Sequence, residues 1–450
     1  MATLYSKRLS QFNHRVLEKN IKNFRLLFYA ILVGILAGGI GALFRLSLQG
    51  IETLKTATLS YFKTTTYTEG IVGCLLCILS IYVSLLLVKK FAPEASGSGI
   101  QEVEGALDEI KPLRWKRVLP IKFIASLFSL SSGLLLGREG PTIQLGANIG
   151  KMVKDIFKQP NEENNPLIST GSAAGLASAF NAPFSGILFV IEEMNGHFKF
   201  NFFSVACIML GASVADIVVR YLLGSSAAIE MQVFSFDHIS MIWMFVLLGL
   251  IFSGIGLLFN SCILKTLDLF KYFKKHPLLI SIVLGIIITL VGMYATDMIT
   301  AGYNTIDNVL KNSFSLRMLL LLLGVRFILS IISYASGVPG GIFAPLLTLG
   351  VVVGMLFGVC AQALFPEQVP NPAIFAVAGM AGIFASTVRA PLTGVALAVE
   401  MTANFGLILP LILTTATAAI CTTVLGNEPI YTSLLRRSIE ELHLKKRRDI

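Results

Sequence analysis

One acidic residue, Glu139, stands out because of the residues around it. It lies in the segment 137–141, Gly-Arg-Glu-Gly-Pro, within a largely apolar part of the chain. Proline suits the first turn of a helix, so a helix is predicted to begin near Pro141. A carboxylate beside the free N–H groups of a helix start can take the place of a diffusible anion. We predict that Glu139 blocks an anion pathway when deprotonated and swings out when protonated. The alternative is a carboxylate that only caps the helix, paired with Arg138.

Two further segments share this character. Residues 335–345, Ala-Ser-Gly-Val-Pro-Gly-Gly-Ile-Phe-Ala-Pro, predict a second helix start near Pro345, and residues 96–100, Ser-Gly-Ser-Gly-Ile, open a segment that runs to Leu107. Helix dipoles and hydroxyl groups attract an anion without holding it as tightly as a full positive charge, which suits transport. Any single break is better explained by a tight turn or close helix packing. Three in one chain favour an anion pathway.

The other acidic residues of the apolar segments indicate a function less specifically than Glu139 does. Glu192 and Glu193 end the apolar run 186–191, and the plainest interpretation is a helix end at the membrane interface. Glu102 and Glu104 follow the first break. Because buried charges need partners, one of these two is predicted to pair with Lys122, which lies in an apolar stretch.

The elements that position these residues are apolar and long. Hydrophobic residues make up 54% of the 450 residues and charged residues 14%, against about 25% charged in a soluble domain. Charge-free stretches cover 26–44, 70–88, 239–264, 277–296 and 401–427, each about the 20 residues that a membrane-spanning helix needs. The stretch 327–366 is interrupted by Gly and Pro and predicts broken helices, which survive at membrane depth only inside protein or along a cavity. The sequence therefore predicts an all-α polytopic membrane protein.

The net charge of +10 gathers at the two ends of the chain. Basic residues that flank membrane segments favour the cytoplasmic side, so both termini are predicted to be cytoplasmic, near anionic lipid, with an even number of crossings. This location argues against nucleic acid as a partner. The basic residues are Lys7, Arg8, Arg15, Lys19, Lys22 and Arg25 before the first apolar stretch, and Arg436, Arg437, Lys445, Lys446, Arg447 and Arg448 after the last.

Neither metal nor cofactor chemistry is predicted. The six cysteines all lie in apolar stretches, and the pair Cys74 and Cys77 has metal-like spacing but no histidine nearby, which favours core packing. We also find no nucleophile–base pair or nucleotide loop, so an enzyme is not expected.

An internal repeat relates the two halves of the chain. Residues 122–150 align with residues 326–354 at a constant offset of 204, and eleven of the 29 positions are identical. A second match, Ala-Pro-x-x-Gly at 182–186 and 390–394, has an offset of 208, and Glu192 then matches Glu400. The change in offset predicts a longer connection in the second half, around 366–372. Paired interruptions at corresponding positions indicate a transport site between two repeats, either parallel or inverted.

The chain resembles the CLC family of chloride channels and chloride/proton antiporters, and among them most the bacterial antiporters. The resemblance extends from about residue 26 to residue 437. Four signatures carry it: Gly-Ser-Gly-Ile at 97–100, Gly-Arg-Glu-Gly-Pro at 137–141, Gly-Ile-Phe-Ala-Pro at 341–345 and Pro-Ile-Tyr at 429–431.

The resemblance implies residue roles. Ser98 and Tyr431 would hold a central chloride through their hydroxyls, and the backbone amides of Ile342 and Phe343 would complete that site. Glu139 would be the external gate and proton acceptor. Glu193 would be the internal proton-transfer acid, a position where channels of the family commonly lack an acid. A Ser at position 98 goes with chloride over nitrate.

The resemblance also implies a homodimer in the bacterial inner membrane, with one pathway per subunit and two inverted repeats of many tilted and broken helices. The dimer surface would involve residues around 183–215 and 405–426. We expect a cytoplasmic segment at 1–25, membrane repeats at 26–223 and 239–426, and a C-terminal cytoplasmic helix and basic tail at 427–450.

Two questions stay open at this stage. A passive gated chloride channel has the same fold as an antiporter, and a fluoride exporter is a more distant alternative against which Ser98 and Tyr431 argue. The family's first signature usually continues with Pro, where this chain has Gln101. Because Gln lacks the fixed φ of Pro, we expect a looser helix start there.

Overall fold

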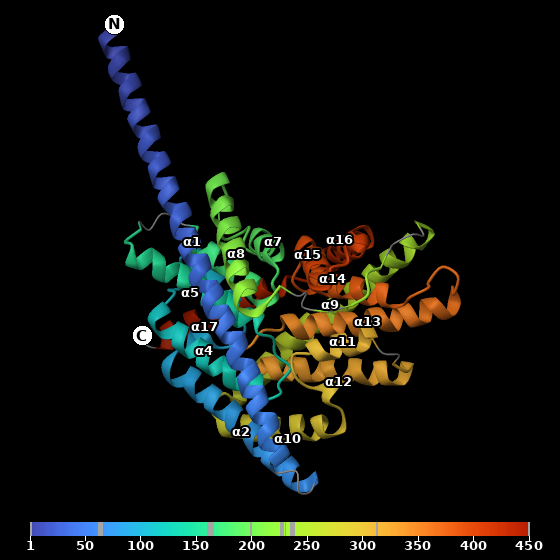
Figure 1. The fold of residues 1–450 in the computed structure, drawn as a ribbon. Coiled ribbons are helices and arrows are strands. Elements are labelled where there is room, and N and C mark those ends of the chain that lie inside the picture. The colour runs from blue at the N-terminus through green and yellow to red at the C-terminus, as the bar shows by residue number, and fades with distance from the viewer. Residues whose placement is uncertain are drawn as a thin grey trace.

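The computed structural model describes residues 2–61, 66–159, 166–198, 200–225, 229, 231–234, 239–311 and 314–448. Within these ranges the protein is built from α-helices and short 3₁₀ turns (Figure 1). The helices are α1 (Ala2–Tyr61), α2 (Thr66–Phe91), α3 (Ile100–Leu107), α4 (Trp115–Ser131), α5 (Glu139–Ile156), α6 (Leu167–Phe180), α7 (Pro183–Glu193), α8 (Phe202–Leu223), α9 (Ile242–Phe273), α10 (Pro277–Tyr294), α11 (Tyr303–Lys311), α12 (Leu316–Ala335), α13 (Phe343–Leu364), α14 (Ala373–Thr387), α15 (Pro391–Thr402), α16 (Ile408–Val424) and α17 (Ile430–Arg448).

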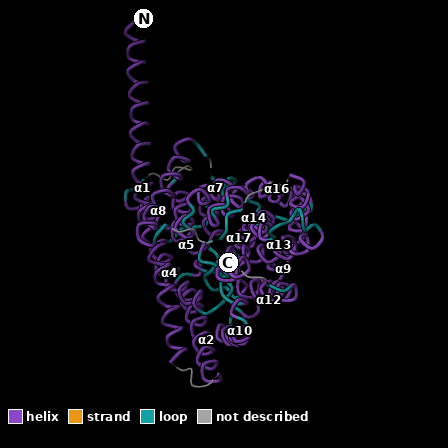
Figure 2. The backbone as a smooth tube through the Cα atoms, turned by 45° about the vertical axis from the view of Figure 1, so that its right-hand side comes forward, coloured by secondary structure: helices purple, strands orange, loops and turns teal. Residues whose placement is uncertain are grey.

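The distribution of apolar residues is that of a multi-pass membrane protein. Eight helical segments in the described part of the chain are long and apolar enough to cross a bilayer. Helices α2 and α10, which lie side by side at one end of the molecule in Figures 1 and 2, expose large apolar side chains such as Leu75 and Leu290. Helices α5, α6, α13 and α14 are buried along most of their length. The protein therefore turns its apolar side chains to lipid and encloses the broken helices.

The two halves are inverted repeats. Gly137 and Gly341, equivalent at the offset of 204, exchange two backbone hydrogen bonds of 2.7 and 2.8 Å, so a pseudo-two-fold axis passes between them. The equivalent helices α7 and α15 pack against each other. Glu192 near the end of α7 accepts from the amides of Leu392 and Thr393 at the start of α15, at 2.9 and 2.7 Å.

The equivalent glutamate of the second half caps α7 in the same way. Glu400 near the end of α15 accepts from the amides of Phe184 and Ser185 at the start of α7, at 3.1 and 2.7 Å. Each helix thus ends where its partner begins, so two equivalent helices run antiparallel, as an inverted repeat requires. Glu192, interpreted from sequence as a helix end at the interface, is a cap of the partner helix.

Glycines let the equivalent helix pairs pack closely. A Cβ on Gly146 would collide with the carbonyl oxygen of Gly171, and a Cβ on Gly350 would collide with that of Gly379. The α5–α6 and α13–α14 contacts are therefore the same contact in the two halves.

The repeat also corrects the predicted long connection. Helix α13 has 22 residues and α5 has 18, so the four extra residues form about one more helical turn of α13. The stretch 401–427 likewise differs from a single span, because α15 ends at Thr402 and Ala403 has a left-handed φ of 55°.

Candidate functional site

The three predicted breaks meet at the centre of the protein. Gly97 accepts from the amide of Gly340 at 3.0 Å and donates to the carbonyl of Val338 at 3.1 Å, while Gly137 pairs with Gly341 as described above. Helices α3, α5 and α13 begin directly after these contacts. Their free first-turn N–H groups are thus brought together. The helix starts lie at Glu139 and Phe343, two residues before the prolines that predicted them, and α3 begins at Ile100.

The predicted ion pair of Lys122 is wrong. Its ammonium group, fully buried, donates to the carbonyl oxygens of residues 95, 97 and 98 at 3.0, 2.7 and 3.2 Å. Glu102 pairs instead with Lys111 at 2.7 Å. The loop before α3 packs against Lys122, so its backbone carbonyl groups act as the acceptors that a buried ammonium group needs. Lys122 therefore shapes the loop that presents Ser98.

Two buried hydroxyls lie near this centre. Ser98 Oγ and Tyr431 Oη are both inaccessible to solvent, and neither makes a hydrogen bond of good geometry with the described residues, although the two lie close enough to interact. An unpaired buried hydroxyl is costly and is the kind of donor that an anion satisfies. The amides of Ile342 and Phe343 at the start of α13 are oriented like other first-turn donors.

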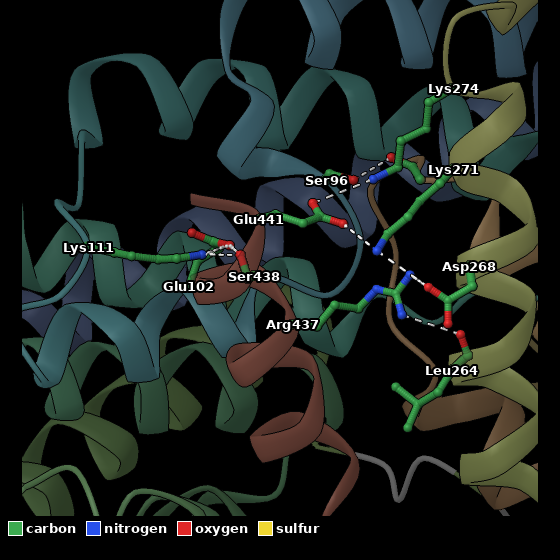
Figure 3. A network of polar contacts seen from close by, with 11 residues as sticks. Ser96, Glu102, Lys111, Leu264, Asp268, Lys271, Lys274, Arg437, Ser438 and Glu441 are labelled. Carbon is green, nitrogen blue, oxygen red and sulfur yellow. Dashed lines mark hydrogen bonds and ion pairs between the residues drawn. The ribbon is translucent and has the colours of Figure 1, made fainter. Parts of the chain in front are cut away.

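Charged contacts about two turns into α17 hold this helix in place (Figure 3). Lys111 bridges Glu102 and Ser438, and Arg437 pairs with Asp268 of α9 at 2.7 Å. Tyr431, at the start of α17, is thus anchored to both halves of the protein.

Glu139 lies at the same centre, at the start of α5. Its carboxylate is fully buried, and its Oε1 accepts a hydrogen bond from the hydroxyl of Tyr303. A Cβ on Gly137 would collide with Glu139 Oε2 and would lie 3.0 Å from the amide nitrogen of Ala344. The carboxylate therefore occupies the space in front of α13, where a free anion would also be attracted. Arg138 lies over the ring of Tyr303, 4.9 Å from its centroid.

A cavity of about 180 Å³ adjoins this carboxylate. Arg45, Lys55 and Arg138 line it together with Glu52 and Tyr303. Its excess of positive charge would raise the local concentration of anions.

Glu193 lies at the end of α7 and is partly exposed. It interacts with Glu104, which is buried and whose two oxygens lack a hydrogen-bond partner of good geometry in the described structure. Both acids are within electrostatic reach of Tyr431. The structure thus brings Ser98, Tyr431, Glu104 and Glu193 close together. It places Glu139 in front of the start of α13, where the amides of Ile342 and Phe343 lie.

Sequence reasoning missed Tyr303. The alignment of the two halves began at Lys122 and Arg326. Extending the same offset backward would have matched Gly99 with Tyr303 and drawn attention to α11.

Comparisons with known proteins agree with this geometry. The family model described as "Voltage gated chloride channel" matches residues 80–423. A relative from Salmonella paratyphi A, named "H(+)/Cl(-) exchange transporter ClcA", is 39% identical over 94% of this chain and 91% of its own length. One from Vibrio vulnificus strain YJ016, with the same name, is 40% identical over 93% of this chain and 91% of its own.

Solved structures have the same fold. A structure titled as that of a slow cyanobacterial Cl⁻/H⁺ antiporter has a TM-score of 0.88 at 37% identity and covers 92% of this chain and 98% of its own. A CLC-type fluoride/proton antiporter has a TM-score of 0.73 at 21% identity, covering 91% of this chain and 97% of its own, which supports the fold alone.

Proposed function

Since this chain belongs to the voltage gated chloride channel family, we propose that it is an antiporter that exchanges chloride for protons across a membrane. The observation that carries the proposal is the meeting of two unpartnered buried hydroxyls with a buried carboxylate that lies in front of a helix start. Relatives named as H⁺/Cl⁻ exchangers, close to 40% identical over nearly the full chain, support exchange over a passive channel.

Chloride would bind between Ser98, Tyr431 and the amides of Ile342 and Phe343. The hydroxyls donate to the anion, and the α13 dipole adds partial positive charge. With hydroxyl and amide donors, binding is weak enough for release.

Glu139 would act as the gate and the outer proton acceptor. Deprotonated, its carboxylate competes with chloride for the space in front of α13. Protonated, it loses its charge and its attraction to that space, so chloride passes. Glu193 would receive the proton from the cytoplasmic side and pass it toward Glu139, while chloride moves the other way.

We further propose a homodimer in the bacterial inner membrane with both termini cytoplasmic, membrane repeats at 26–223 and 239–426, and cytoplasmic segments at 1–25 and 427–450. Exposed apolar side chains on α7, α8, α15 and α16, including Phe184, Ile217, Leu392 and Ile420, support the dimer surface. Photobleaching steps of labelled protein in vesicles check the subunit number, and labelling of single cysteines at each end checks the orientation.

Ion-flux measurements on the protein in lipid vesicles test the proposed exchange of chloride for protons. An outward chloride gradient imposed on protein-containing vesicles is expected to drive protons inward against a proton gradient, so the external medium becomes alkaline. Collapse of the chloride gradient abolishes this uptake. Chloride flux without proton movement would instead establish a passive channel, and a preference for fluoride would overturn chloride as the substrate.

Measurements of chloride affinity test the proposed chloride site. Replacing Tyr431 by Phe removes one donor and keeps the ring. Chloride affinity measured by calorimetry is expected to fall by at least about 10-fold, as for the loss of one hydrogen bond to a charged group. Tyr272→Phe, an exposed position on α9, is the matched control. Unchanged affinity in Tyr431→Phe would exclude its hydroxyl from the site.

A further inference from the structure

The second half of the protein contains a counterpart of the loop that presents Ser98. At the offset of 204, Lys122 corresponds to Arg326, and both cations are fully buried. Arg326 donates to the carbonyl oxygens of residues 297, 299, 300 and 301 at 2.8, 3.1, 3.1 and 3.0 Å, as Lys122 does to those near residue 97. Each half thus gathers one loop around one buried cation.

A short helix follows each loop. Helix α3 begins at Ile100 after Gly99, and α11 begins at Tyr303 after Gly302, which has a left-handed φ of 104°. The first loop brings the Ser98 hydroxyl to the inner side of the pathway. The second brings the Tyr303 hydroxyl to the outer side, where it donates to Glu139 Oε1. Each half thus supplies one hydroxyl from the residues around its loop, although the two positions are not equivalent, since Ser98 corresponds to Gly302 and Tyr303 to Gly99.

The ring of Tyr303 has little freedom. The guanidinium group of Arg138 lies 4.9 Å from its centroid, and the ring of Phe180 lies 6.3 Å away in an edge-on contact. Arg326 holds the preceding loop. A hydroxyl fixed in this way retains its direction whether or not the carboxylate is present.

From this geometry we propose that Tyr303 is a positioning residue that latches the deprotonated Glu139 carboxylate in the pathway and thereby sets the pH at which the gate opens. The inference rests on the proposed role of Glu139. A hydroxyl donates to a carboxylate more strongly than to a neutral carboxyl group, so the latch favours the closed, charged form.

Other charges face the same carboxylate. Arg138 adjoins it on its own helix, and Arg45, Lys55 and Glu52 of α1 line the adjoining cavity. Helix α13 presents the amide of Ala344 and no ionisable side chain in its first turn. None of these groups changes when only the Tyr303 hydroxyl is removed, so its contribution can be isolated.

Tyr303→Phe is the decisive variant, because it keeps the ring contacts and removes only the donor. Exchange in vesicles is expected to become half-maximal about one pH unit higher than in the unmodified protein. The maximal rate at low pH and the ratio of chloride to protons are expected to stay the same. Tyr294→Phe, an exposed tyrosine at the end of α10, is the matched control.

The outcomes separate the inference from the proposed function. An unchanged pH profile with normal thermal stability would overturn the latch. If the unmodified protein moved chloride without protons, the antiporter proposal would fail, and the pH profile of chloride flux would still test the latch. A lower maximal rate with an unshifted midpoint would show a merely structural role for the hydroxyl.

Discussion

Replacing Glu139 by glutamine is expected to abolish proton transport while chloride still crosses the membrane. Glutamine has nearly the same shape as protonated glutamate but can neither release a proton nor carry the negative charge that competes with chloride in front of α13. We expect proton movement in vesicles to fall by at least about 100-fold, to background, since the group that carries the proton is gone. Chloride flux should also lose its pH dependence.

A surface acid provides the control for this variant. Glu367 lies exposed on the connection between α13 and α14, and Glu367→Gln should leave both fluxes unchanged. Proton transport that persisted in Glu139→Gln would exclude this carboxylate as the gate. Chloride flux that stopped altogether would indicate that the charged form is needed to open the pathway rather than to close it.

Replacing Glu193 by glutamine is expected to stop proton transport in a different way. Glu193 lies next to Glu104 and within electrostatic reach of Tyr431. Its loss would cut the proton path from the cytoplasmic side, so uphill proton uptake should fall to background. Chloride flux should continue and should still depend on pH, because Glu139 remains and can be protonated from outside. Simultaneous chloride and proton recordings in vesicles measure both.

The adjacent residue provides a matched control. The Glu192 carboxylate accepts hydrogen bonds from α15 rather than facing Glu104. Glu192→Gln is therefore expected to keep proton coupling and to lower the free energy of unfolding by about 1 kcal/mol, as for a weakened helix cap. If Glu192→Gln lost coupling and Glu193→Gln kept it, the two roles assigned to this acidic pair would be reversed.

Much of this protein could be predicted from local pattern. The charge-free stretches and the Gly- and Pro-rich breaks revealed the membrane helices and the helix starts at α3, α5 and α13, because hydrophobic length and proline placement act within a few residues. The offset of 204 revealed the repeat, because equivalent residues in two homologous halves meet equivalent surroundings. Glu139 stood out for the same reason, as a charge at a helix start in an apolar segment.

The partners of buried polar groups could not be predicted in this way. Lys122 was assigned to an acidic residue and instead binds three carbonyl groups. Glu192 caps a helix 200 residues away, and Glu139 accepts from Tyr303, 164 residues away. The local sequence pattern indicates that a buried polar group needs a hydrogen-bond partner. It does not indicate which of several possible donors or acceptors, distant along the chain, is that partner.

The sequence by itself determined which residues must be buried, where helices start and that the chain consists of two related halves. Only the tertiary structure decided that the halves are inverted and interlocked through the caps of α7 and α15. It also decided that the outer hydroxyl belongs to Tyr303. The physical reason is that helix formation and burial depend on neighbours along the chain, whereas the choice among hydrogen-bond partners depends on which distant segments packing brings within about 3 Å.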